Sequence, residues 1–201
     1  MVSIERNVTD LNNWNKKNAL RITLYSVLYF VGTLIVCVLG AVHPIMFVCY
    51  QVTAALLLTG LTVTAFDKVR SFGAAFCFSA CMIIALFVIQ DASLWHCIPL
   101  IAIAVIAESI RAISKYSWKG DVIAAVVMSY SSFGYYGQIW FNRAYTYQCA
   151  VEEMPEEYAD SLMALSPVWA LPLIIIAGIV ISIVTAYLTA RIFGLDKKRE
   201  T

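Results

Sequence analysis

Six long runs of apolar residues, separated by short polar segments, dominate the hydrophobic pattern of this chain. A bilayer core of about 30 Å is crossed by roughly 20 apolar residues in helical conformation. Because a segment in lipid has to satisfy its own backbone hydrogen bonds, each run is predicted to form a helix. The pattern predicts an all-α membrane protein, a six-transmembrane-helix bundle that makes residues 1–201 one integral membrane domain. The predicted spans are about residues 20–41, 44–66, 72–90, 95–113, 122–141 and 167–193.

Lys and Arg residues gather on one side of this predicted bundle. With six spans, thirteen of the 14 cationic residues fall on the side that carries both termini, and Arg143 alone falls on the other. An excess of Lys and Arg is typical of cytoplasmic loops. The N- and C-termini are therefore predicted to be cytoplasmic, in a multi-pass protein of the cell membrane.

Composition supports lipid as the solvent. The chain is 61% hydrophobic and 13% charged, whereas soluble domains are about half apolar and about a quarter charged. No basic patch is interleaved with aromatic residues, so no nucleic-acid partner is expected. Most of the six cysteines lie in apolar runs, where cysteine behaves as a small hydrophobe. Cys97 and Cys149 fall near the same membrane surface, and whether they pair stays open.

The longest connection, residues 142–166, is acidic and lies on the outer side. Within it, Pro155 followed by two glutamates predicts the start of a short helix. Tyr158, Leu162 and Leu165 recur at helical spacing and predict one apolar face. Two interpretations remain open for this segment, a solvated connector and a lid over a binding cavity.

Polar and aromatic side chains converge on the outer half of the predicted bundle. Polar groups inside spans are costly and often mark function, and small-molecule sites are typically aromatic-lined with a few polar groups. The competing interpretations are interfacial anchoring for the tryptophans, ordinary interfacial placement for the histidines and helix-to-helix hydrogen bonding for the glutamines. The candidate ligand-binding residues are Gln51, Tyr135, Tyr136, Gln138, Trp140, Trp95, His96, His43, Asp91 and Trp169.

Three patterns predict contacts between helices. The polar run at 122–141 should line a cavity or a helix interface rather than face lipid. Small residues at four-residue spacing in the last span predict close packing inside the bundle, or a subunit interface as the alternative. Glu108 and Arg111, one turn apart, are predicted to pair with each other or with Lys115.

Known catalytic signatures are missing from the sequence. There is no His-Glu-x-x-His zinc motif, no Gly-x-Ser-x-Gly elbow and no glycine-rich phosphate loop. We therefore expect no catalytic residue, no protein-bound metal, no intrinsic cofactor and no ATP hydrolysis by this chain.

Two stretches carry a resemblance to a known family, YADSLMALSPVW at 158–169 and LYSVLYF at 24–30. They resemble the Trep_Strep family of bacterial integral membrane proteins, which is similar to the substrate-binding S components of energy-coupling factor (ECF) transporters. The resemblance implies a solute-capturing subunit in the bacterial cell membrane, assembled with a T-type transmembrane protein and two ABC ATPases that power uptake.

The resemblance also bears on docking and on the solute. S components often show Ala-x-x-x-Ala in the first helix for docking on the T protein, and this chain has Ala19 and Thr23, with Ser26 nearby. A small organic or metal-related solute is implied, and the aromatic residues would suit a flat molecule such as haem or a corrinoid. The alternative function is a structural or regulatory membrane subunit with no solute of its own.

Overall fold

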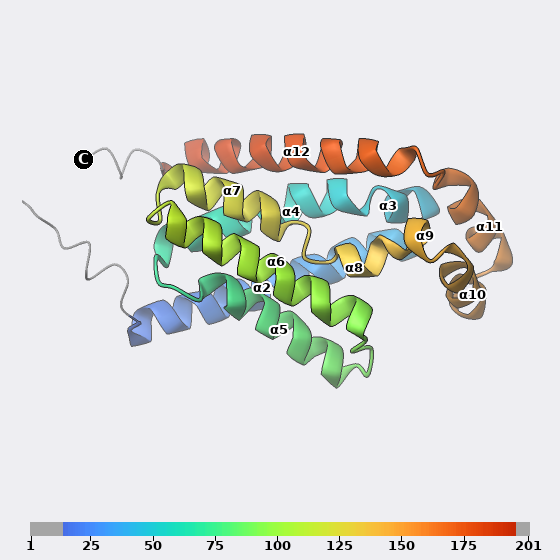
Figure 1. Cartoon of the computed structure of the whole chain (residues 1–201), viewed down its shortest axis with the longest axis horizontal. Helices are drawn as coiled ribbons and strands as arrows, with labels where there is room; N and C mark the ends of the chain where they lie inside the picture. Colours follow the sequence, from blue (N-terminus) through green and yellow to red (C-terminus); the bar gives the residue numbers. More distant parts are fainter. Residues whose placement is uncertain (1–13, 196–201) are drawn as a thin grey trace, which may run out of the picture.

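The computed structural model describes residues 14–195, which form helices packed lengthwise in an elongated bundle (Figure 1). No strand occurs in this range, so the all-α prediction is confirmed. The long helices are α2 (Lys16–Val42), α4 (Tyr50–Lys68), α5 (Ala74–Val88), α6 (Leu94–Ile113), α7 (Trp118–Met128) and α12 (Ala170–Phe193). The short ones are α3 (Pro44–Val48), α8 (Phe133–Tyr136), α9 (Gln138–Phe141), α10 (Arg143–Glu153) and α11 (Glu156–Leu165).

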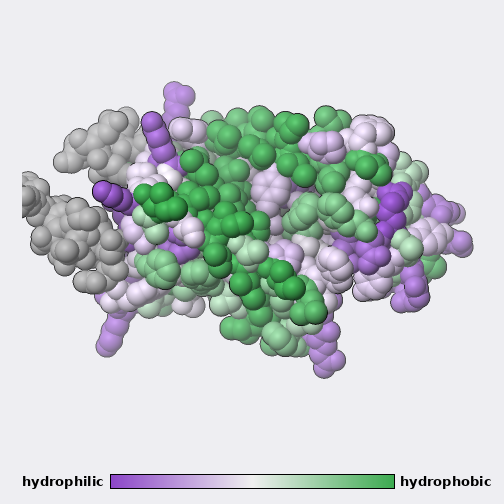
Figure 2. All heavy atoms as spheres, in the orientation of Figure 1, coloured by the Kyte–Doolittle hydropathy of each residue, from purple (hydrophilic) through white to green (hydrophobic). Residues whose placement is uncertain are grey.

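The bundle has two distinct ends. Both ends of the described chain lie at one of them, the terminal end, and α10 and α11 form the other, the loop end (Figure 1). Apolar side chains cover the middle of the face in Figure 2, and hydrophilic side chains gather towards both ends. Within the described range, α2, α6 and α12 are long and apolar enough to cross a membrane, and α5 is a shorter apolar helix. This distribution is the one expected of a protein whose middle contacts lipid.

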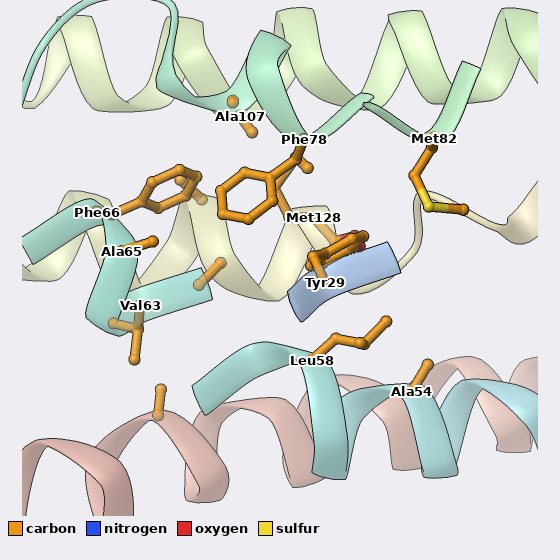
Figure 3. Packing of buried hydrophobic residues seen from close by; sticks show 14 of the residues in the cluster. Tyr29, Ala54, Leu58, Val63, Ala65, Phe66, Phe78, Met82, Ala107 and Met128 are labelled. Atoms are coloured by element: carbon orange, nitrogen blue, oxygen red, sulfur yellow. The ribbon is translucent and has the colours of Figure 1, made fainter. Parts of the chain in front are cut away.

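The core lies around α4, which packs against α2, α7 and α12. Aromatic rings from three helices meet there: the ring centroids of Tyr29 and Phe78 are 5.0 Å apart, and those of Phe66 and Phe78 are 5.9 Å apart. Figure 3 shows these rings beside Met128. Such tilted and edge-on ring pairs add to the stabilisation from apolar burial.

The small residues of the last span pack inside the bundle. Gly178, Ser182, Ala186 and Ala190 are all buried, and Thr59 of α4 donates a hydrogen bond to the Ser182 hydroxyl at 3.1 Å. Small side chains let two helix backbones approach closely. The prediction of packing within the bundle is confirmed.

Two predicted spans are not continuous helices, and that part of the prediction is wrong. The run 44–66 is divided at Cys49 into α3 and α4, and the run 122–141 is interrupted by a turn at residues 129–132. Ser129 Oγ donates to the Val126 carbonyl at 2.7 Å, and its side chain is buried among neighbouring helices. Irregular backbone at membrane depth is tolerated where it is buried in protein in this way.

The outer segment 142–166 forms two helices, where one was predicted. The predicted helix is present as α11, and Pro155 is its cap. Its buried face is narrower than predicted: Leu162 is buried and Tyr158 half-buried, but Leu165 is 40% exposed. Helix α10 was missed because its sequence, RAYTYQCAVEE, carries no clear apolar stripe.

A buried cluster of charges joins four helices towards the terminal end. Arg111 is fully buried, with Nε 3.0 Å from Asp121 Oδ1 and Nη1 3.3 Å from Glu108 Oε1. Its Nη2 donates to the Val69 carbonyl at 2.8 Å, and its guanidinium lies 4.1 Å from the centre of the Phe66 ring. Glu108 Oε2 also accepts a backbone N–H from the start of α5 at 2.9 Å. The predicted pairing of Glu108 with Arg111 is confirmed, and Asp121 is a further partner.

Candidate functional site

A cavity of about 240 Å³ lies at the loop end, and we call it the outer cavity. Its walls come from α2, α3, the start of α6, α8, α9, α10 and α11, together with the segment that connects α5 to α6. Helix α10 contributes residues 145, 146, 149, 150 and 153, which share one helix face because side chains three to four apart lie together. Helices α10 and α11 of the segment 142–166 thus line a cavity, and the lid interpretation requires such a cavity.

A second cavity of about 230 Å³ lies deeper, between α2, α5 and the start of α6, and we call it the inner cavity. Its lining is mostly apolar and includes Phe30, Met82 and Leu86. Four residues line both cavities and form the wall between them: Cys37, Asp91, His96 and Tyr135.

Tyr135 is the aromatic part of this wall. Its ring centroid lies 5.5 Å from that of Phe47, 6.0 Å from Tyr50 and 5.6 Å from His96. These neighbours come from α3, α4 and α6, so three separate helices fix the ring. His96 Nδ1 lies 2.9 Å from the Asp91 backbone oxygen and 3.6 Å from Asp91 Oδ2. These contacts join His96 to Asp91 within the wall.

Gln138 lines the outer cavity, and one polar atom of its side chain is unsatisfied. The residue is only 9% exposed, and its Nε2 donates to the Gly134 carbonyl at 3.0 Å. Its Oε1 is buried without a hydrogen-bond partner. A buried acceptor left unpaired costs about 1–3 kcal/mol. A rotation of the Gln138 side chain that brought Oε1 to the cavity surface would let a donor on a bound molecule recover this cost.

Gln51 and Tyr136 lie outside both cavities, in a buried hydrogen-bond network. Tyr136 Oη donates to Gln51 Oε1 at 2.6 Å, and Gln51 Nε2 donates to Ser129 Oγ at 3.0 Å. Ser129 Oγ in turn lies 3.1 Å from Ser182 Oγ on α12. The side-chain amide of Gln51 is therefore satisfied within the protein, and these two residues join α4, α8 and α12.

The remaining candidates are dispersed. His43 caps α3, with Nδ1 accepting the Ile45 N–H at 3.2 Å, and buried Trp140 donates from Nε1 to the Pro167 carbonyl at 3.1 Å. Trp95 and Trp169 are 63% and 68% exposed and do not line either cavity. Their positions fit interfacial anchoring better than ligand contact. Of the ten candidates, four line the outer cavity: Asp91, His96, Tyr135 and Gln138.

Hydrogen bonds hold the outer helices in place. Tyr158 Oη donates to the Gly40 carbonyl at 2.6 Å, which fastens α11 to α2, and burial raises the pKa of Tyr158. Tyr147 Oη donates to Asp160 Oδ1 at 3.0 Å, which joins α10 to α11 and raises the pKa of Tyr147. Of the three lid candidates, Tyr158 and Leu162 line the outer cavity and Leu165 does not.

Removing the Tyr158 hydroxyl should loosen α11. In Tyr158→Phe we expect the α11 amides to exchange with deuterium several-fold faster, because losing one hydrogen bond costs about 0.5–1.5 kcal/mol. Hydrogen exchange followed by mass spectrometry in detergent micelles measures this. Tyr147→Phe is the control, since water replaces its exposed hydrogen bond and exchange should stay near the wild-type rate. Equal exchange in Tyr158→Phe and the wild type would contradict the fastening role.

Sequence reasoning missed several cavity residues, among them Cys37, Phe47 and Tyr145. The helical spacing of residues 145, 149 and 153 was the available signal, but the absence of a strong apolar stripe concealed it. All six cysteines are free thiols, so Cys97 and Cys149 are not joined.

The partner-interface candidates do not share one surface. Ala19 and Thr23 are exposed on α2, and the Thr23 hydroxyl donates to the Ala19 carbonyl at 2.9 Å. Ser26 is only 3% exposed and faces the bundle interior. Ser26 is therefore not available for docking, and that part of the prediction is wrong.

Comparison with known protein families identifies a match over most of the chain. A family described as "hypothetical bacterial integral membrane protein (Trep_Strep)" matches residues 16–194. Neither the search of curated proteins nor the search of solved structures finds a match.

Proposed function

We propose a solute-binding transport function for this chain, which belongs to the Trep_Strep family of bacterial integral membrane proteins. The observation that carries the proposal is the outer cavity with its unpaired acceptor, Gln138 Oε1, beneath two fastened helices. A polar atom buried without a partner is rare in proteins and calls for an explanation. A solute that donates to Gln138 would supply one.

The proposed orientation puts the outer cavity outside the bacterial cytoplasmic membrane. In this arrangement α2, α3–α4, α5, α6, α7–α9 and α12 are the six passes, and the terminal end is cytoplasmic. The distribution of thirteen of the 14 cations supports this direction. So does the position of both described ends of the chain at one end of the bundle (Figure 1).

The proposed mechanism has two stages, one in each cavity, and the wall residues lie between the two cavities. A solute first occupies the outer cavity beneath α10 and α11. The Tyr135 ring lines both this cavity and the inner one, so a change of its rotamer would alter the wall between them. The sequence carries no phosphate-binding loop, so ATP-driven uptake would need partner ATPases. The expected partners are an ECF T-type protein and two ABC ATPases.

One observation favours the second candidate, a structural or regulatory subunit without a solute. Gln51, the most deeply placed amide, is fully buried and satisfied by Tyr136 and Ser129. If the Gln138 amide were fully hydrogen-bonded within the protein, as the Gln51 amide is, the bundle would need no solute to satisfy it. The satisfied Gln51 thus favours a structural or regulatory subunit, whereas the unpaired Oε1 of Gln138 favours transport.

Purification from native bacterial membranes tests the transport proposal. We expect the tagged chain, extracted in a mild detergent, to recover ABC ATPases and a T-type protein in stoichiometric amounts, measured by quantitative mass spectrometry. An unrelated tagged membrane protein of similar size is the control for adventitious capture. Recovery of this chain alone across several detergents would overturn the ECF assignment.

A further inference from the structure

Among the Asp, Glu, Lys and Arg residues of the described chain, only acidic ones line the outer cavity. Asp91 and Glu153 contribute carboxylates, and none of the described residues that line the cavity is a Lys or Arg. Both residues are exposed, so their carboxylates retain access to solvent. A cavity with this lining has a negative potential, which attracts a positively charged solute and disfavours an anion.

The guanidinium of Arg143, in the helix that contributes most to the cavity lining, is engaged elsewhere. Arg143 Nη1 donates to the Ser166 carbonyl at 2.6 Å and to the Ile139 carbonyl at 3.2 Å, and its Nη2 donates to the Met163 carbonyl at 2.9 Å. These bonds hold the guanidinium at the junction of α9, α10 and α11. Arg143 therefore does not neutralise Asp91 or Glu153 through a direct ion pair within the described part of the chain.

The neutral groups of the cavity point to the same chemistry. Gln138 Oε1 is a hydrogen-bond acceptor that needs a donor, and an ammonium N–H is a strong one. The rings of Phe47, Tyr135 and Tyr158 line the cavity, and aromatic faces attract cations. Carboxylates, an unpaired acceptor and aromatic rings thus favour a single class of solute.

The volume of the outer cavity limits the size of the solute that it can bind. Sites for drug-sized ligands usually measure about 300–1,000 Å³, and the outer cavity measures about 240 Å³. A compact molecule fits this volume better than a macrocycle such as haem or a corrinoid. We propose that the outer cavity binds a compact organic cation, an amine that donates to Gln138 Oε1 while Asp91 and Glu153 balance its charge. This inference rests on the proposed solute-binding function and names its substrate class.

Three probes of equal size and different charge test the inference: benzylammonium, benzyl alcohol and benzoate. Binding to the full chain in lipid nanodiscs is measured by isothermal titration calorimetry at low ionic strength. We expect benzylammonium to bind about tenfold more tightly than benzyl alcohol, and benzoate to bind most weakly. In the double variant Asp91→Asn, Glu153→Gln the preference should fall to about twofold or less, since only the charge has been removed.

A matched control and a second variant complete the design. Glu157→Gln removes an exposed carboxylate of the same outer segment that does not line the cavity, and it should keep the preference. Gln138→Leu removes the acceptor and should weaken benzylammonium more than benzyl alcohol. If benzoate binds best, and does so only when Gln138 is intact, the charge inference is overturned while solute binding stands. If no probe binds and no ATPase is recovered, both the inference and the proposed function are overturned.

Discussion

Arg111→Met should destabilise the protein more than any other single substitution of a charged residue in the described chain. The change leaves Glu108 and Asp121 as buried carboxylates without the guanidinium that joins them. Breaking a buried ion pair by removing one partner costs about 3–5 kcal/mol. The Val69 carbonyl and the Phe66 ring lose their contacts as well. Thermal unfolding in detergent micelles, followed by helical circular dichroism, should show a large fall in the midpoint.

The control and the rescue separate charge from packing. Lys119→Met removes an exposed cation near the same end of the bundle and should stay within about 0.5 kcal/mol of the wild type. The triple variant Arg111→Met, Glu108→Gln, Asp121→Asn removes the stranded charges and should recover part of the stability. A single Arg111→Met variant as stable as Lys119→Met would contradict the structural role of the cluster.

The fold was predictable where one physical constraint dominated. Long apolar runs allow only helices in lipid, and this predicted α2, α5, α6 and α12 within a few residues. The small-residue row in α12 was readable because close helix packing requires it. The turn at 129–132 was not predictable, because its backbone is tolerated only through burial by helices distant in sequence. The polar run at 122–141 indicated burial, but the order of apolar and polar residues does not show where the backbone leaves the helix.

The candidate site was predictable in its location but not in its membership. Depth along the predicted spans placed Gln51 and Gln138 in the same outer half, and the structure separates them. Gln51 faces α7, α8 and α12 and is satisfied there, whereas Gln138 lines the outer cavity. The rotation of each helix about its axis decides between these outcomes. The apolar content of a span does not fix that rotation when polar residues lie on more than one of its faces.

Gly134→Ala should displace α8, which carries Tyr135, the aromatic part of the wall. A Cβ at this position would collide with the Trp95 backbone carbonyl and would lie 2.6 Å from Pro99 Cγ. A backbone atom has little freedom to move aside, so α8 has to shift away from α6. Overpacking of this kind costs about 1–3 kcal/mol, occasionally more. Tyr135 follows directly, and Gln138 Nε2 donates to the Gly134 carbonyl. We therefore expect lower stability and at least about tenfold weaker benzylammonium binding, a loss of roughly 1.4 kcal/mol.

Gly32→Ala is the matched comparison, because it adds the same methyl group to a helix contact that lines neither cavity. Its Cβ would lie 2.8 Å from Leu58 Cδ2, the end of a flexible side chain rather than a backbone atom. We expect a smaller loss of stability and unchanged binding of the probe. Calorimetry and thermal unfolding of the two variants side by side distinguish strain in α8 from a general intolerance of added volume. Equal effects of the two substitutions on binding would show that α8 does not position the site.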